Sequence, residues 1–171
     1  MIAELANYLG RIEDLRSQIS GLVAALPAKA LNWRPIEGKD DHAANSLAVL
    51  ATHIAGAEHF WIAEVVGNRP ETRDRDAEFA TIAANATEIT QLLANNALET
   101  REVFSTLSES ELNGMRQTGG RSVPVRWCIL HVIDHTSLHL GHMQITYQLW
   151  SGGKSMPSPP WFERLPPNQD F

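Results

Sequence analysis

Apolar residues recur at steps of three and four along most of this chain, and no stretch alternates apolar and polar residues as a half-buried strand does. Such a period places the apolar side chains of a helix on one face, which must then be buried against other helices. Asn45 and Ser46 can cap the second helix, and Pro27 and Gly67 end the first and second helices. The predicted long helices cover residues 2–26, 45–67, about 77–107 (with Phe79 and Ile82 on the inner side) and about 124–150.

The connections between these helices differ in length and character. The loop over residues 27–44 is longer than an up-and-down bundle needs, and long loops often cover or line a site. The charged segment 69–76 (RPETRDRD) is expected to be an exposed connection, and residues 114–122 to form a loop or a short extended segment. Ser108 and Glu111 form the pattern of a capping box. Prolines exclude a helix from the tail after residue 150, where Trp161 and Phe162 are expected to dock on the bundle.

These patterns predict an all-α protein, a four-helix bundle forming a single domain over residues 1–171. The chain is 43% hydrophobic and 20% charged, which excludes an intrinsically disordered protein. The net charge is −6 and no cluster of Lys and Arg stands out, so we expect no nucleic-acid partner. The sequence contains no run of about 18 apolar residues, so we expect no membrane span. The single cysteine and the acidic, mixed start of the chain favour the cytoplasm.

Four of the seven histidines lie within twelve residues of the last predicted helix. At 100° per residue, His135, His139 and His142 project at about 40°, 80° and 20° from His131, so all four share one side. A single inward histidine is usually a hydrogen-bonded core residue. Four together compete for few partners, and each unsatisfied buried nitrogen costs about 1–3 kcal/mol. A metal ion that binds one nitrogen of each ring would remove this cost.

His135 and His139 stand four residues apart, a spacing that lets two imidazoles on one helix bind the same divalent ion. A third ligand must come from another element. His53 is the natural candidate because it falls in the apolar stripe of the second helix, whereas His59 is expected to face solvent and His42 lies in the preceding loop. Three imidazoles leave a coordination position open, as in reactive metal sites. They suit Zn²⁺, Ni²⁺ or Fe²⁺ alike.

Other motifs are missing from the sequence. There is no HExxH pattern of a metalloprotease, no Glu-x-x-His pair of a di-iron carboxylate bundle, and no spaced cysteine pair of a zinc finger. Cys128 faces the histidine side of its helix but is expected to be a small buried thiol. Glu64 is expected to be a carboxylate at the rim of the site.

Three segments carry a resemblance to a known family. They are LNWRP (31–35) with Asn45 and Ser46 before the second helix, His53 within LAVLATHIAGAEHFWI (47–62), and HVIDHTSLHLGHMQ (131–144) with its HxxxHxG core. Together they resemble the DinB family, which is related to bacillithiol- and mycothiol-dependent S-transferases and to maleylpyruvate isomerases. The resemblance covers about residues 1–150.

The resemblance implies a DinB-like four-helix bundle that binds one divalent metal ion through His53, His135 and His139. It further implies that the open position holds water or a low-molecular-weight thiol, which in the transferases attacks an electrophile as a thiolate. The expected partners are therefore small-molecule thiols or electrophiles, and a homodimer is compatible with the family and with the acidic, alanine-rich helices.

The chain departs from the family pattern after the glycine of the HxG core, where many members have Gln and this chain has His142. His142 could be a further ligand, a general base or a hydrogen-bonding neighbour of a ligand, and we favour the last role, for which His131 is a second candidate. Two classes of function fit the sequence. One is a metal-dependent thiol S-transferase or a related hydrolase or isomerase, and the other is a non-catalytic bundle that a metal stabilises or that senses metal.

Overall fold

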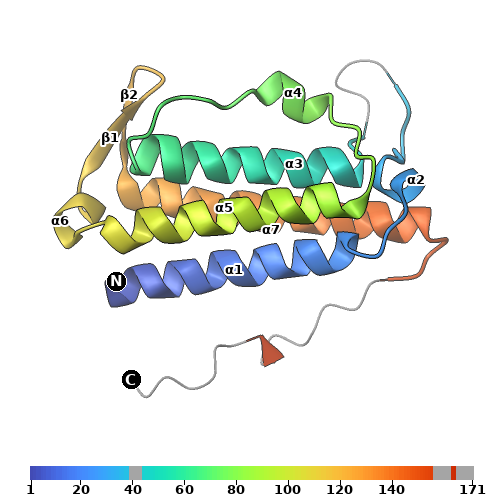
Figure 1. The fold of residues 1–171 in the computed structure, drawn as a ribbon, viewed down its shortest axis with the longest axis horizontal. Helices are drawn as coiled ribbons and strands as arrows, with labels where there is room; N and C mark the ends of the chain where they lie inside the picture. Colours follow the sequence, from blue (N-terminus) through green and yellow to red (C-terminus); the bar gives the residue numbers. More distant parts are fainter. Residues whose placement is uncertain (39–43, 156–162, 165–171) are drawn as a thin grey trace.

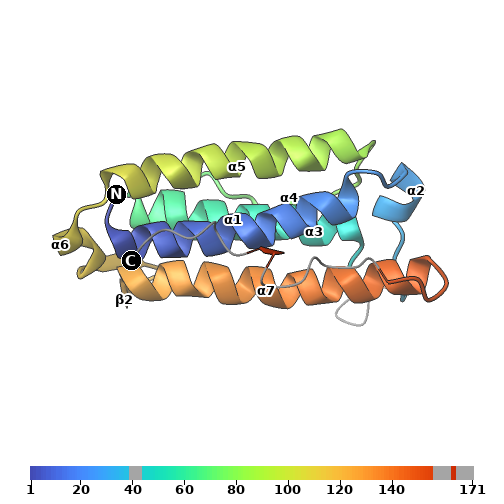
Figure 2. The ribbon, with the colours of Figure 1, turned by 90° about the horizontal axis from the view of Figure 1, so that it is seen from below.

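The computed structural model describes residues 1–38, 44–155 and 163–164, and its core is a bundle of four long helices (Figure 1). Helix α1 (Ala3–Val23) packs against α5 (Ala86–Thr106) and α7 (Val125–Trp150). Helix α3 (Leu47–Glu58), continued by the π-helix η2 (His59–Val66), packs against the same two helices from the other side. Figure 2 shows α1 in front and α3 behind, with α5 and α7 on either side. The predicted helical bundle is confirmed.

The first, second and fourth predicted helices match α1, α3 with η2, and α7 closely. Helix α3 begins where predicted, because the Ser46 hydroxyl accepts a hydrogen bond from the backbone N–H of Val49 at 3.2 Å. The long connection before it contains the short helix α2 (Ala28–Leu31). The predicted capping box is also present, with Ser108 opening α6 (Glu109–Leu112) and Glu111 bonding back to its backbone N–H.

The predicted third helix is wrong at its start. Residues 77–85 do not belong to α5: a separate short helix, α4 (Arg75–Phe79), is capped by Asp74, and a new cap at Asn85 opens α5. Asp and Asn compete with helical hydrogen bonding inside a helix and favour its N-cap. Asp74 therefore opens α4 and Asn85 opens α5, although the apolar spacing predicted one continuous helix. Ile82, expected inside, is 82% exposed, and Phe79 packs against His53 instead.

Residues 114–124 form a small hairpin, which settles the choice between loop and extended segment. Strand β1 (Met115–Thr118) pairs with β2 (Arg121–Pro124) in antiparallel register. Gly119 and Gly120 join the strands with φ of 54° and 72°. Positive φ at both central residues is typical of a type I′ turn, whose twist matches that of the two strands.

Helix α3 is buried on almost every side, with ten of its twelve residues in the interior. The reason is a strap, residues 68–85 including α4, which lies along the outer side of α3 in Figure 1. The strap therefore brings charged side chains against a helix that carries apolar residues around its whole circumference. Among the described helices, none combines the length and apolar character needed to cross a membrane. His42, Trp161 and Phe162, about which the sequence raised expectations, lie outside the described residues.

Candidate metal centre

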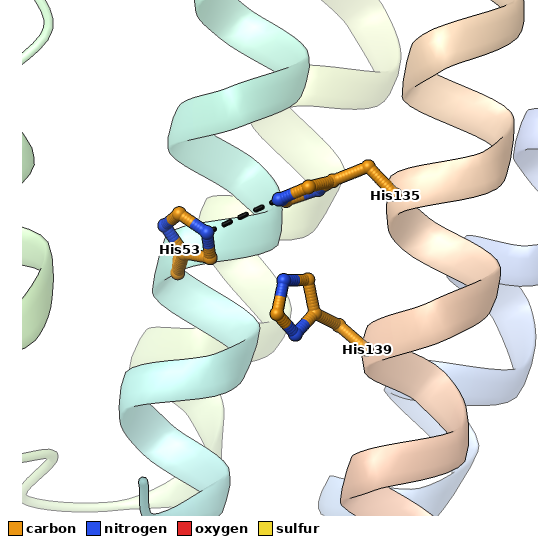
Figure 3. Close-up of side chains that lie close together, drawn as sticks. All are labelled: His53, His135 and His139. Atoms are coloured by element: carbon orange, nitrogen blue, oxygen red, sulfur yellow. Dashed lines mark hydrogen bonds between the residues drawn. The ribbon is translucent and has the colours of Figure 1, made fainter. Parts of the chain in front are cut away.

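His53 of α3 meets His135 and His139 of α7 between the two helices (Figure 3). Each residue offers one ligand atom, and the three atoms lie within 4.8 Å of one another. The Nε2 atoms of His53 and His135 are 3.1 Å apart. Ring centroids are separated by 4.4 Å between His135 and His139, and by 4.9 Å and 5.1 Å from each of these to His53. The structure thus brings together the three residues expected to bind metal.

The packing of α3 against α7 creates this meeting. His53 is 7% exposed and points from the middle of α3 toward α7, while the four-residue spacing of His135 and His139 places their rings edge to face on one side of α7. His135 and His139 are only half-buried. The group is therefore only partly enclosed on the side of α7, although His53 itself is buried.

The ring nitrogens of this group are poorly satisfied by protein alone. Of the two Nε2 atoms facing each other, only one can carry the hydrogen that their contact needs. The Nδ1 atom of His135 is buried and has no hydrogen-bond partner among the described residues. Imidazole nitrogens are ligands of Zn²⁺, Ni²⁺ and Fe²⁺, so one ion between the three rings would use the facing lone pairs. The donor set and its spacing fit a divalent metal ion.

Burial and crowding keep the rings of His135 and His139 neutral. Loss of solvent, together with the neighbouring His139 and His53, lowers the pKa of His135 to about 3. Burial is also the main reason that the pKa of His139 falls to about 4, followed by its neighbours His53 and His142. Both rings therefore hold a free lone pair at neutral pH, which is the form that binds metal.

The other two histidines of α7 flank the group at its ends. The Nδ1 atoms of His142 and His139 lie 3.3 Å apart, so the exposed His142 ring touches a candidate ligand on the side away from the cluster. His131 lies 5.8 Å from His135 between ring centroids and stacks on Trp127 at 4.8 Å, with Trp61 at its edge. The two neighbours thus extend the site in opposite directions, toward a polar surface at His142 and an aromatic wall at His131.

The structure adds two residues that the sequence did not suggest. The Nδ1 atom of His53 lies 2.8 Å from Glu78 Oε2, and Arg73 binds both oxygens of the same carboxylate at 2.6 Å and 2.9 Å. Both residues belong to the strap: Arg73 lies in the charged segment 69–76 that was expected to be an exposed connection, and Glu78 lies in the part that was expected to begin the third long helix. A short helix of five residues carries no apolar period, so no sequence signal marked Glu78 as an interior group.

Two further expectations are corrected in η2 and its surroundings. His59 does not face open solvent: its Nδ1 atom lies 2.6 Å from Glu99 Oε2 and its Nε2 atom 2.8 Å from Thr72 Oγ1. Glu64 is not a rim carboxylate but is 6% exposed and accepts the backbone N–H groups of Thr72 and Arg73. Burial raises the pKa of Glu64, and these hydrogen bonds outweigh that effect and lower it. The strap covers both residues.

Cys128 is fully buried in the apolar core, as expected for a small interior thiol. Burial raises the pKa of this thiol to about 11, because a thiolate there would lose its hydration. A thiol in this state is a poor nucleophile at neutral pH.

Fold and site together define a helical bundle with a three-histidine cluster that could hold a metal ion. The DinB superfamily model matches residues 11–143, and the chain belongs to the DinB superfamily. The curated proteins searched include no match to this chain.

Two solved structures share the fold. A DinB-like protein from Bacillus cereus ATCC 10987 superposes with a TM-score of 0.68 at 17% identity, covering 91% of this chain and 95% of its own. A conserved protein from Enterococcus faecalis has a TM-score of 0.71 at 15% identity, with 89% and 99% covered. At such identities the likeness concerns the fold.

Proposed function

We propose that the protein binds one divalent metal ion through His53, His135 and His139 and uses it as a thiol S-transferase, with a low-molecular-weight thiol and a small electrophile as substrates. The observation that carries this proposal is the convergence of three imidazoles from two helices, two of them half-buried, within 4.8 Å. A bound divalent ion at such a site supplies Lewis acidity, which favours the deprotonated form of a thiol or of water.

The side chains of this protein would divide the remaining tasks. The lowered pKa values of His135 and His139 keep each ring neutral at physiological pH, so one nitrogen of each ring has a free lone pair for a metal ion. The enclosed His53 anchors the site to α3, while the half-exposed α7 side admits substrates. The aromatic wall of Trp61, Trp127 and His131 borders the site and offers an apolar surface to a substrate. His142 hydrogen-bonds to His139 and limits how that ring can rotate.

The test is a panel of thiols, namely mycothiol, bacillithiol and glutathione, each assayed with a generic electrophile and protein loaded with Zn²⁺, Ni²⁺ or Fe²⁺. We expect thiol consumption with at least one thiol and metal, and none with the His135→Ala variant. If no combination gives turnover while wild-type protein binds metal, the catalytic part of the proposal is wrong.

A second candidate is a non-catalytic bundle that the metal stabilises or that senses metal. It is favoured by the enclosure of His53, which links the two central helices of the site. The two candidates predict different apoproteins. A catalytic metal can be stripped with a chelator while the bundle stays largely folded, whereas loss of a structural metal removes several kcal/mol of stability. Thermal melts of apo and metal-loaded protein separate them.

A further inference from the structure

We propose that Glu78 is a positioning residue for the metal centre: it fixes the His53 ring with its hydrogen on Nδ1 and so presents Nε2 to the ion. This inference rests on the proposed metal-binding function of the three-histidine group. It assigns a role to a residue of the strap that has no place in the ligand set itself.

The first step is the hydrogen bond between His53 and Glu78. The two atoms, Nδ1 and Oε2, are 2.8 Å apart, and the side chains are 9% and 6% exposed. A carboxylate only accepts, so the hydrogen lies on Nδ1. In a neutral ring Nε2 then carries the lone pair, and Nε2 is the atom that lies 3.1 Å from His135. In many metal sites a carboxylate holds a histidine ligand in this way.

The second step is the support of Glu78 itself. Arg73 binds its two oxygens through Nε and Nη2, and its guanidinium carbon lies 5.6 Å from the centre of the Phe60 ring. The backbone at Arg73 is fixed in turn, because its N–H donates to Glu64 of η2 at 2.8 Å. A planar guanidinium that binds both oxygens leaves the carboxylate one orientation, with an edge toward His53.

The third step is the space that the carboxylate occupies. Gly56 lies one turn after His53 on α3, and a Cβ atom at this position would collide with the carboxylate of Glu78. The glycine is a helix-weakening residue in the middle of α3, and this close approach gives it a physical reason. One set of contacts, made by residues 53, 56, 73 and 78, therefore acts on a single nitrogen, Nδ1 of His53.

His53 differs in this respect from the other two candidate ligands. The Nδ1 atom of His139 contacts the exposed imidazole of His142, and that of His135 has no partner among the described residues. Within the described part of the chain, His53 is thus the ligand that a charged group holds directly. We expect the affinity of the site to depend on Glu78 more than on His142.

The experiment measures Zn²⁺ affinity by competition with a chromophoric chelator. Glu78→Gln and Gly56→Ala are expected to weaken binding about 10–100-fold, as removal of such supporting groups does in other metal sites. Glu99→Gln is the matched control, since Glu99 pairs with His59 in the same manner outside the three-histidine group, and it should change affinity less than twofold. Affinity in Glu78→Gln equal to that in the control would overturn the proposal.

A second readout does not depend on metal. Nitrogen chemical shifts of the His53 ring in the metal-free protein should report a hydrogen on Nδ1 in the wild type and a mixture of tautomers in Glu78→Ala. A cavity of about 270 Å³ borders Gly56, Arg73 and Glu78, so added formate can reach the position vacated in Glu78→Ala. Formate should then restore Zn²⁺ affinity in Glu78→Ala but not in His135→Ala.

The outcomes separate the two proposals. If wild-type protein fails to bind Zn²⁺, Ni²⁺ or Fe²⁺, the proposed function fails, whatever the tautomer. If the wild type binds metal but its His53 carries hydrogen on Nε2, or formate has no effect on Glu78→Ala, the role of Glu78 is wrong and the metal site stands.

Discussion

Two histidines on one continuous helical segment have almost the same partners. His53 pairs with Glu78, which Arg73 holds, and His59 pairs with Glu99, which Arg69 holds at 3.2 Å. In each case the Nδ1 atom of the ring faces the carboxylate. The two groups differ at the other nitrogen: Nε2 of His59 faces Thr72 and Glu64, whereas Nε2 of His53 faces the imidazole of His135.

This difference shows which feature makes a histidine a candidate ligand. A carboxylate partner alone does not distinguish the two, because both rings have one. At His59 the protein supplies hydrogen-bond partners for both nitrogens, so the ring is complete as a structural group. At His53 the second nitrogen meets another ring of the same kind, and the pair needs either a shared hydrogen or a metal ion.

The largest expected effect tests this comparison directly, and it is a change in the metal content of the protein. We expect His135→Ala to lower Zn²⁺ affinity more than about 100-fold, since loss of a direct ligand exceeds the loss of a supporting group. His59→Ala should retain the metal content of the wild type. Elemental analysis of dialysed protein measures both, and equal loss in the two variants would remove the basis for choosing His53 over His59.

The next effect is the stabilisation that metal binding gives to the folded state. Free Zn²⁺ at 100 times its dissociation constant should stabilise the protein by about 2.7 kcal/mol. For a chain of this size that is a rise in Tm of several degrees. Scanning calorimetry with and without Zn²⁺ should show the rise in the wild type and in His59→Ala, and no rise in His53→Ala. A rise that survives in His53→Ala would place the ion elsewhere.

A smaller effect follows from the lowered pKa values in the metal-free protein. His135 and His139 have pKa values of about 3 and about 4 in the folded state, against 6.5 for an ordinary histidine. As pH falls from 6.5, the unfolded chain therefore binds protons that the folded protein does not, and the free energy of unfolding decreases. Above pH 6.5 neither state binds these protons, so the contribution of the two neutral rings to the free energy of unfolding is fully present.

Urea unfolding of apoprotein at about pH 7.5 and about pH 5 measures this slope, which should be shallower in His135→Gln. Hydrogen bonds to Arg126 and Tyr8 lower the pKa of Glu4 from 4.5 to about 2, so this carboxylate affects stability only below this pH range. A slope unchanged in His135→Gln would show that the ring is more hydrated than its position indicates.

The members of the three-histidine cluster could be predicted from the sequence because helical geometry fixes which side chains share a face. The four-residue spacing of His135 and His139 sets their common face whatever the packing, and the apolar stripe around His53 directs that ring inward. The same reasoning placed His142 next to this pair. What the spacing could not supply is the distance between α3 and α7, which depends on packing across the bundle.

Glu78 and Arg73 could not be predicted for a physical reason. They lie in the strap, where local capping by Asp74 and Asn85 decides the structure and no period relates one residue to another. A charged segment is usually solvated, and only the covering of α3 by the strap makes these charges interior. Glu64 was misjudged for the same reason, since its partners are backbone N–H groups of the strap.

The smallest expected effect tests the structural character of the His59 group. Glu99 is 23% exposed at its side chain and Arg69 33%, so the ion pair is screened and contributes about 0–1 kcal/mol. Glu99→Gln keeps an oxygen that accepts from His59 and should cost less than about 1 kcal/mol of stability in urea unfolding. Its Zn²⁺-induced rise in Tm should equal that of the wild type, because His59 has no part in the proposed metal centre.

A diminished rise in this variant would show that the strap couples the two groups, since Thr72 next to Arg73 contacts both His59 and Glu64. The two arginine–glutamate–histidine groups would then act as one support rather than two.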